Sequence, residues 1–207
     1  MNSLKFGFVL ILFVFGERSF AAVHAEKILV LGDSLSAGYG ILVEEGWVHL
    51  LQHELQVKEG AQVINASVSG ETSSGGRTRL PALLREHQPS ILIIELGGND
   101  GLRGQPLKLL DENLQAMIVA GKQAGAQVLL IGMQITGNYG ARYTREFKEI
   151  YPRVSEKNKL VLVPFLLEGV ATKPGWMQED RIHPKAVAQA TVMNNVLPVL
   201  LPMLKKK

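Results

Sequence analysis

The sequence contains no cysteine. This absence excludes a disulfide framework and attachment of a lipid to an amino-terminal cysteine. A chain of 207 residues can bury a sizeable core without disulfides, so the absence does not argue against export. The chain also has no large excess of charge of one sign, because 22 basic and 19 acidic residues give a net charge of +3. The basic residues form a run only at 205–207. The composition therefore predicts no nucleic-acid binding.

Three common functional motifs are missing or incomplete. The chain has no Gly-x-Ser-x-Gly, which excludes the nucleophile elbow of the α/β-hydrolases. The segment 38–40 reads Gly-Tyr-Gly and lacks the third glycine of a dinucleotide-binding fingerprint. His49 and His53 share the spacing of zinc ligands on a helix, but Leu50 stands where a metalloprotease has glutamate. We therefore expect neither an organic cofactor nor a metal ion.

Long hydrophobic runs are absent apart from one near the amino terminus. Lys5 precedes an apolar run at 6–15, and small residues suited to cleavage lie at 19–21 and 23–25. This pattern is typical of a secretory signal peptide, and a run of ten is short for a membrane span. It predicts a signal peptide at 1–25, a mature domain at 26–207 without a membrane span, and a periplasmic or secreted location. A retained amino-terminal anchor is the alternative.

The rest of the chain alternates between two hydrophobic patterns. Short apolar runs predict strands at 28–31, 63–64, 91–96, 128–131 and 160–163, and helical spacing predicts helices at 47–55, 80–87, 107–124, 143–158 and 184–204. Nearly continuous apolar strands between helices favour a parallel sheet covered on both faces, a three-layer α/β/α sandwich. We expect the last helix to face the core and to fray at Pro198 and Pro202.

The most specific chemical signal is a serine near one end of the chain and a histidine near the other. Ser34 lies in Gly-Asp-Ser-Leu-Ser directly after the first predicted strand, and His183 lies in Asp-Arg-Ile-His-Pro. A serine hydroxyl becomes a nucleophile when an imidazole takes its proton, and a carboxylate such as Asp180 orients the imidazole. Taken alone, the first segment also fits an ordinary turn and the second a helix cap.

Two further segments supply donors for an oxyanion. Gly70 and Asn99 follow the second and third predicted strands, as Ser34 follows the first. A glycine lets a backbone N–H approach a ligand closely, and the asparagine amide can donate a hydrogen bond. Ligands bind at the carboxyl ends of strands in open parallel sheets, so these three segments should converge on one edge.

These blocks, in this order, resemble the SGNH hydrolase family, also called the GDSL esterases, over residues 27–187. The resemblance implies a flavodoxin-like α/β/α sandwich with a five-stranded parallel sheet. It implies Ser34 as nucleophile, His183 as base and Asp180 as the orienting acid. The backbone N–H groups of Ser34 and Gly70 and the amide of Asn99 would then form the oxyanion hole.

Segments 99–104, 138–140 and 175–178 are similar to the periplasmic family members that act as acyl-CoA thioesterase, protease and lysophospholipase. This similarity implies a monomeric carboxylic ester hydrolase acting on acyl esters and thioesters, including lysophospholipids. Leu102 and Tyr139 would then contact the substrate. We also expect the loop 101–106 to be a mobile flap over the acyl-binding groove, because Gly101 and Gly104 allow backbone changes, with an ordinary strand-to-helix connection as the alternative. Two alternatives stay open: an acetyl esterase acting on carbohydrate, and a lipid-binding module without catalysis.

Overall fold

The computed structural model describes residues 26–204, so the predicted signal peptide at 1–25 lies outside the described residues. Within that range, five strands form one parallel sheet in the order β2-β1-β3-β4-β5. The strands are β1 (Lys27–Gly32), β2 (Gln62–Asn65), β3 (Ile91–Glu95), β4 (Gln127–Ile131) and β5 (Val161–Val163). The predicted fold, a flavodoxin-like sandwich around a parallel sheet, is confirmed.

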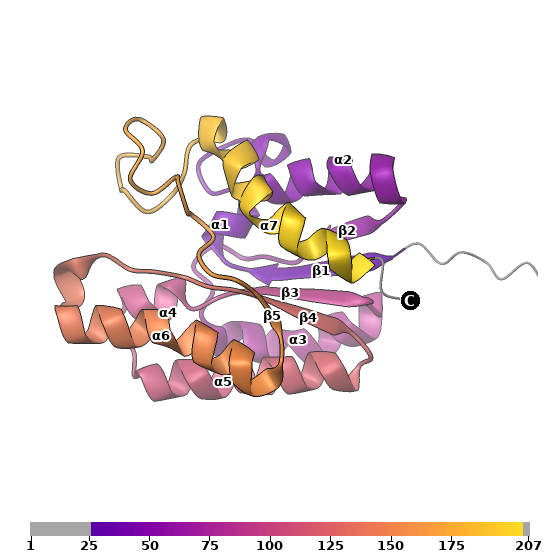
Figure 1. Ribbon diagram of the computed structural model, residues 1–207, viewed down its shortest axis with the longest axis horizontal. Coiled ribbons are helices and arrows are strands. Elements are labelled where there is room, and N and C mark those ends of the chain that lie inside the picture. The colour runs from indigo at the N-terminus through magenta and orange to yellow at the C-terminus, as the bar shows by residue number, and fades with distance from the viewer. Residues whose placement is uncertain (1–25, 205–207) are drawn as a thin grey trace, which may run out of the picture.

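Helices cover both faces of the sheet (Figure 1). One face carries α2 (Trp47–Glu59) and α7 (Gln189–Leu204), and the other carries α3 (Ser73–His87), α5 (Leu107–Gln123) and α6 (Ala141–Asn158). Two short helices, α1 (Ser34–Ala37) and α4 (Gly98–Leu102), and the 3₁₀ turns η1 (Val43–Glu45), η2 (Gly137–Tyr139) and η3 (Ala186–Ala188) complete the described elements. The short helices were not predicted, because four or five residues carry no hydrophobic period.

The central strands form the core. Ile28 to Leu31 of β1 and Ile91 to Ile94 of β3 are fully buried, because helices lie on both sides of them. Glu95, the last residue of β3, is also fully buried and is the exception in this apolar layer.

All five predicted helices are present but their bounds are shifted: α2 ends at Glu59 rather than residue 55, α7 begins at Gln189 rather than residue 184, and the largest shift is in α3. Helix α3 begins at Ser73 rather than residue 80, because the Thr72 side chain accepts a hydrogen bond from the N–H of Gly75 and caps an earlier turn. Helix α7 continues through Pro198 and Pro202, so the predicted fraying is wrong. Residues on either side of these prolines, Val196, Leu200 and Met203, are buried, and this packing outweighs the lost backbone hydrogen bonds.

The prediction that the last helix faces the core is confirmed by those buried residues. By length and composition, the segment Ala186–Leu204 is also the one helix among residues 26–204 that is apolar enough to cross a membrane. In the fold it packs against α2 and β5, which accounts for its apolar composition.

The strand order reverses direction between β1 and β3. The chain passes from β1 through α2 to β2 on one face, and from β3 through α5 to β4 on the other. A reversal of this kind opens a crevice at the carboxyl ends of the two neighbouring strands. Ser34 follows β1 and Asn99 follows β3, so the fold places both residues beside this crevice.

Candidate active site

Ser34 is the first residue of α1 and is half-buried at the end of β1. The helix starts there because the Asp33 side chain accepts a hydrogen bond from the N–H of Leu35 at 3.0 Å. It ends after one turn at Gly38, whose φ of 75° is left-handed. The first N–H groups of a helix have no intrahelical acceptor, so the backbone around Ser34 can donate to a ligand.

His183 lies on a loop before α7 that is tied to the Ser34 segment. An antiparallel bridge pairs Met177 with Pro184, and the N–H of Gln178 donates to the carbonyl of His183 at 2.8 Å. The Gln178 side chain then donates to the carbonyl of Tyr39 at 2.8 Å. The Tyr39 ring lies 4.5 Å from the His183 ring between centroids, and these contacts hold the loop over the start of α1.

Three predicted site residues meet in a hydrogen-bonded chain. His183 Nε2 lies 2.8 Å from Ser34 Oγ, across 149 positions of sequence. His183 Nδ1 lies 2.6 Å from Asp180 Oδ2. The other Asp180 oxygen accepts the N–H groups of Ile182 and His183 at 2.9 and 3.0 Å, which fixes the turn that presents both side chains.

The environment of Asp180 keeps it ionised. Partial burial acts to raise the pKa of Asp180, but the hydrogen bonds from His183 and Ile182 favour the carboxylate and outweigh it. The net pKa of Asp180 lies below its ordinary value. A carboxylate at this position favours a proton on His183 Nδ1, which leaves Nε2 free to accept the Ser34 proton.

The two other predicted segments reach the same edge of the sheet. The N–H of Val68 donates to the carbonyl of Gly32 at 3.0 Å, so the chain leading to Gly70 runs beside the end of β1. The Arg103 side chain donates to the carbonyl of Gly70 at 3.0 Å. Asn99 Nδ2 lies 3.1 Å from Asp33 Oδ2, one residue from Ser34. The structure therefore brings Ser34, Gly70 and Asn99 to adjoining segments.

A buried network cross-links the segments after β2 and β3. Asp100 is almost fully buried and accepts hydrogen bonds from the N–H of Ser73 at 2.8 Å and its hydroxyl at 2.5 Å. The Asn113 amide donates to the Ser73 hydroxyl at 2.9 Å. The beginning of α3 is thereby fixed to α4, which carries Asn99.

Sequence reasoning missed the acidic pair beneath Ser34. Glu95 Oε2 accepts hydrogen bonds from the Ser36 hydroxyl at 2.6 Å and from the N–H of Asp33 at 3.2 Å. Burial, with a smaller contribution from Asp33, raises the pKa of Glu95 well above its ordinary value. Burial also raises the pKa of Asp33 to about 6. The signal in the sequence was a single acid ending a strand that is otherwise aliphatic.

The loop predicted at 101–106 is partly helical, because α4 extends to Leu102. Two tyrosines hold the loop. The Tyr139 hydroxyl donates to the carbonyl of Leu102 at 2.8 Å, and the Tyr143 hydroxyl donates to the carbonyl of Gln105 at 2.8 Å. Leu102 and Tyr139, the predicted substrate contacts, are therefore in contact with each other.

The histidine pair considered for a metal lies elsewhere. His49 and His53 are exposed on α2. Across residues 26–204, no group of three or more histidine, aspartate or glutamate side chains is placed to hold a metal ion.

The chain is similar to known proteins over most of its length. A model of the GDSL-like lipase/acylhydrolase family matches residues 30–190. Esterase TesA of Pseudomonas aeruginosa is 50% identical over 182 residues, which cover 87% of this chain and 90% of TesA. Thioesterase 1/protease 1/lysophospholipase L1 of Escherichia coli is 43% identical over 185 residues, which cover 89% of this chain and 88% of that protein.

A solved structure extends the similarity to three dimensions. A crystal structure of the psychrotrophic esterase EstA from Pseudoalteromonas, inhibited by monoethylphosphonate, is 40% identical and superposes with a TM-score of 0.83. The match covers 87% of this chain and 100% of EstA. The family and the relatives are ester hydrolases by name, which sets aside the alternative of a lipid-binding module without catalysis. The chain belongs to the GDSL-like lipase/acylhydrolase family and is a carboxylic ester hydrolase.

Proposed function

We propose that this protein cleaves acyl esters and thioesters through a covalent acyl-enzyme formed on Ser34. In the first step, Ser34 Oγ attacks the acyl carbon while His183 Nε2 takes the hydroxyl proton. The tetrahedral intermediate collapses with departure of the alcohol or thiol, which receives that proton from His183. In the second step, water attacks the acyl carbon while His183 Nε2 takes its proton. The Ser34 oxygen then leaves, receives that proton from His183, and the carboxylic acid is released.

The observation that carries this proposal is the pair of hydrogen bonds around His183. A contact of 2.8 Å from Nε2 to Ser34 Oγ and one of 2.6 Å from Nδ1 to Asp180 Oδ2 are the geometry that general-base activation of a serine needs. The phosphonate-inhibited esterase among the similar structures supports the same chemistry.

We assign the oxyanion donors to the N–H groups of Ser34 and Gly70 and to the amide of Asn99. The convergence of the three segments at the carboxyl ends of β1, β2 and β3 supports this assignment. Gly70 has a φ of 79°, a conformation that glycine adopts without strain, and this suits an N–H turned toward a ligand. Such donors act on the charge that develops in the transition state.

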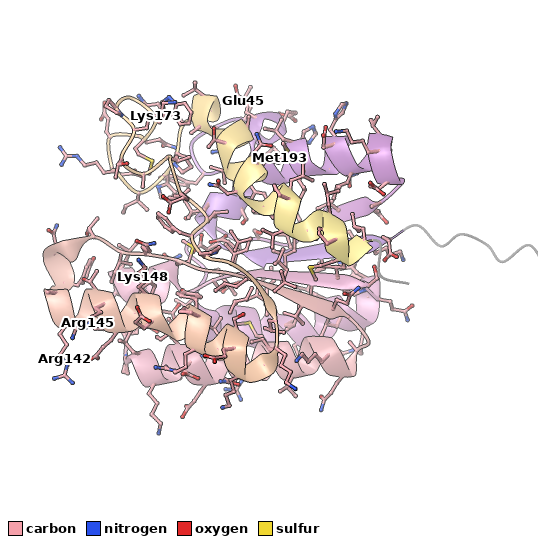
Figure 2. The ribbon with its side chains drawn as sticks, viewed as in Figure 1. Glu45, Arg142, Arg145, Lys148, Lys173 and Met193 are labelled. Carbon is pink, nitrogen blue, oxygen red and sulfur yellow. The ribbon has the colours of Figure 1, made fainter. Side chains whose placement is uncertain are left out.

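The substrate class follows from the relatives and from charge. Relatives named thioesterase and lysophospholipase support acyl-CoA and lysophospholipid substrates, both of which carry phosphate. Arg103, exposed beside Gly70, is a cation near the reacting ester. Figure 2 shows two further basic residues at the same end of the molecule, Lys173 on the loop before α7 and Arg142 on α6, of which Arg142 is already paired with Glu146 at 2.7 Å. Salt should therefore weaken turnover of these anionic substrates more than turnover of neutral nitrophenyl esters.

A fluorophosphonate probe tests the mechanism. It should label Ser34 in the active protein, as mass spectrometry of peptides would show, and Ser34→Ala should lose both labelling and turnover while keeping its thermal midpoint. Labelling at another serine, or full activity of Ser34→Ala, would contradict the assignment.

A substrate panel tests the class: nitrophenyl esters of graded chain length, an acyl-CoA, a lysophospholipid and an acetylated sugar. Preference for the acetylated sugar would support the carbohydrate acetyl esterase instead.

We further propose that the enzyme is exported and acts as a monomer without a membrane span. The support for export is the charged start, apolar run and small-residue cleavage site in residues 1–25. Mass spectrometry of exported protein should find a new amino terminus between residues 22 and 26. An intact Met1 on membrane-bound protein would favour the retained anchor, and light scattering would test the monomer.

A further inference from the structure

Asp33 makes two hydrogen bonds through different oxygens. Oδ1 accepts the N–H of Leu35 at 3.0 Å, and Oδ2 lies 3.1 Å from Asn99 Nδ2. The first contact is that of an ordinary helix cap. The second joins the residue before the nucleophile to the side chain that we assign to the oxyanion hole.

We propose that Asp33 is a positioning residue that fixes the orientation of the Asn99 amide for catalysis. This inference rests on the proposed function. An ionised carboxylate can only accept hydrogen bonds, so it holds the NH₂ end of the amide and repels its carbonyl end. One of the two hydrogens on Nδ2 is used by Asp33, and the second is left to donate to the oxyanion. A reversed amide would present its carbonyl oxygen to a developing negative charge.

The buried pair beneath the turn supplies the charge that this role requires. Glu95 is fully buried, and its Oε1 has no hydrogen-bond partner, so the interior disfavours a negative charge there. Asp33 accepts two N–H groups, which favours its ionised form. Near neutral pH the pair therefore holds its proton on Glu95 and its charge on the carboxylate that contacts Asn99.

The close packing of these groups leaves little freedom for either carboxyl. A side chain at Gly32 would place its Cβ 2.6 Å from Glu95 Oε2, and one at Gly98 would place it 3.2 Å from Asp33 Oδ2. The other ionisable groups that act on Asp33 are His183, which favours its charge, and Asp100, which opposes it. Gly32 and Gly98 thus leave room for the carboxyl groups of Glu95 and Asp33.

Two substitutions separate positioning from simple capping. Asp33→Ser retains a good cap but has one oxygen in place of two. Asp33→Asn has the same shape and also caps well, but its NH₂ group would turn the Asn99 amide around. A capping role predicts that both variants keep their activity. A positioning role predicts that both lose turnover, and that the isosteric Asp33→Asn loses at least as much as Asp33→Ser.

The decisive experiment is a double-mutant cycle with Asn99→Ala, measured as kcat and KM on a nitrophenyl ester. Asn99→Ala should lower kcat by about 100- to 1,000-fold, and each Asp33 variant by about 10- to 100-fold, with KM changed less than about 3-fold. In the Asn99→Ala background, the same Asp33 substitutions should lower kcat by less than about 3-fold. Asp111→Ser, which removes a carboxylate paired with Arg153 on the surface, serves as the matched control and should have unchanged kcat.

Other outcomes overturn the inference. Equal losses in both backgrounds would mean that Asp33 acts independently of Asn99, and full activity of Asp33→Asn would mean that it is only a cap. If one Asp33 variant fails to fold, as thermal unfolding would show, the cycle is completed with the other. Fluorophosphonate labelling of Ser34 in the wild type distinguishes the two proposals: absent labelling refutes the proposed function, whereas labelling with an additive cycle refutes this inference alone.

Discussion

Asp33 and Asn99 lie 66 positions apart in the sequence, yet a side-chain hydrogen bond of 3.1 Å joins them. The contact crosses from the end of β1 to the beginning of α4, over the point where the strand order reverses. It links the segment that carries Ser34 to the segment that carries the asparagine amide.

Replacing Asp180 with asparagine should leave the fold intact and abolish most turnover. The asparagine carbonyl can still accept the N–H groups of Ile182 and His183, but its NH₂ group faces His183 Nδ1 and favours the wrong tautomer. We expect kcat to fall by about 10³- to 10⁴-fold with an unchanged thermal midpoint. Glu179→Gln, at the exposed neighbouring position, is the control and should retain full activity. A loss below about 10-fold would contradict a role for Asp180 in orienting His183.

The acid side of the pH–rate profile should contain a contribution from Asp33. Its pKa is raised to about 6, so protonation in weak acid removes the negative charge that orients Asn99 and leaves a carboxyl that can also donate a hydrogen bond. The rate of the wild type should therefore fall more steeply below about pH 6 than the rate of Asp33→Ser, which lacks this carboxyl. Identical slopes in both enzymes would argue against titration of Asp33.

Replacing Glu95 with glutamine should stabilise the protein increasingly as the pH rises. Burial raises the pKa of Glu95 in the folded state, so above about pH 4 the folded protein retains a proton that the unfolded chain releases. The wild type therefore loses stability from that pH upward, whereas the neutral amide of Glu95→Gln carries no such penalty. The thermal midpoint of the variant relative to the wild type should increase between about pH 4.5 and pH 8, at roughly 2–4 °C per kcal/mol. A difference that does not change with pH would contradict a neutral Glu95.

Removing the Tyr139 hydroxyl should release one end of the loop 103–106. Tyr139→Phe loses the hydrogen bond to the carbonyl of Leu102, one of the two tyrosine bonds that hold this segment. If the loop closes over the acyl chain, kcat/KM should change by about 3- to 10-fold more for long-chain than for short-chain nitrophenyl esters, because only a long chain needs covering. Equal effects at every length would leave the loop as an ordinary connection. The substitution Gly104→Pro is a poorer probe of this loop, because proline cannot adopt the φ of 62° found at that position.

Local pattern was enough to predict the layers of this fold. The short aliphatic runs of β1 and β3 are typical of strands covered on both faces, and the helices between them favour a parallel sheet. The positions of Ser34, Gly70 and Asn99 in the segments that follow three strands also predicted a common edge. The regular continuation of α7 past Pro198 and Pro202 could not be predicted from local pattern, because prolines break a helix unless tertiary packing stabilises it.

The sequence by itself determined which residue types lie at the strand ends, since that depends on hydrophobic period and on turn-forming residues. Tertiary structure alone decided which of them touch. From the sequence, Asp33 is an ordinary turn residue, and only the fold places Asn99 beside it. Likewise Glu95 is the last residue of a strand in the sequence, and only its burial in the fold disfavours its charge. Both effects depend on groups far apart in the chain, because hydrogen-bond partners and solvent access are set by the packing of segments and not by their local order.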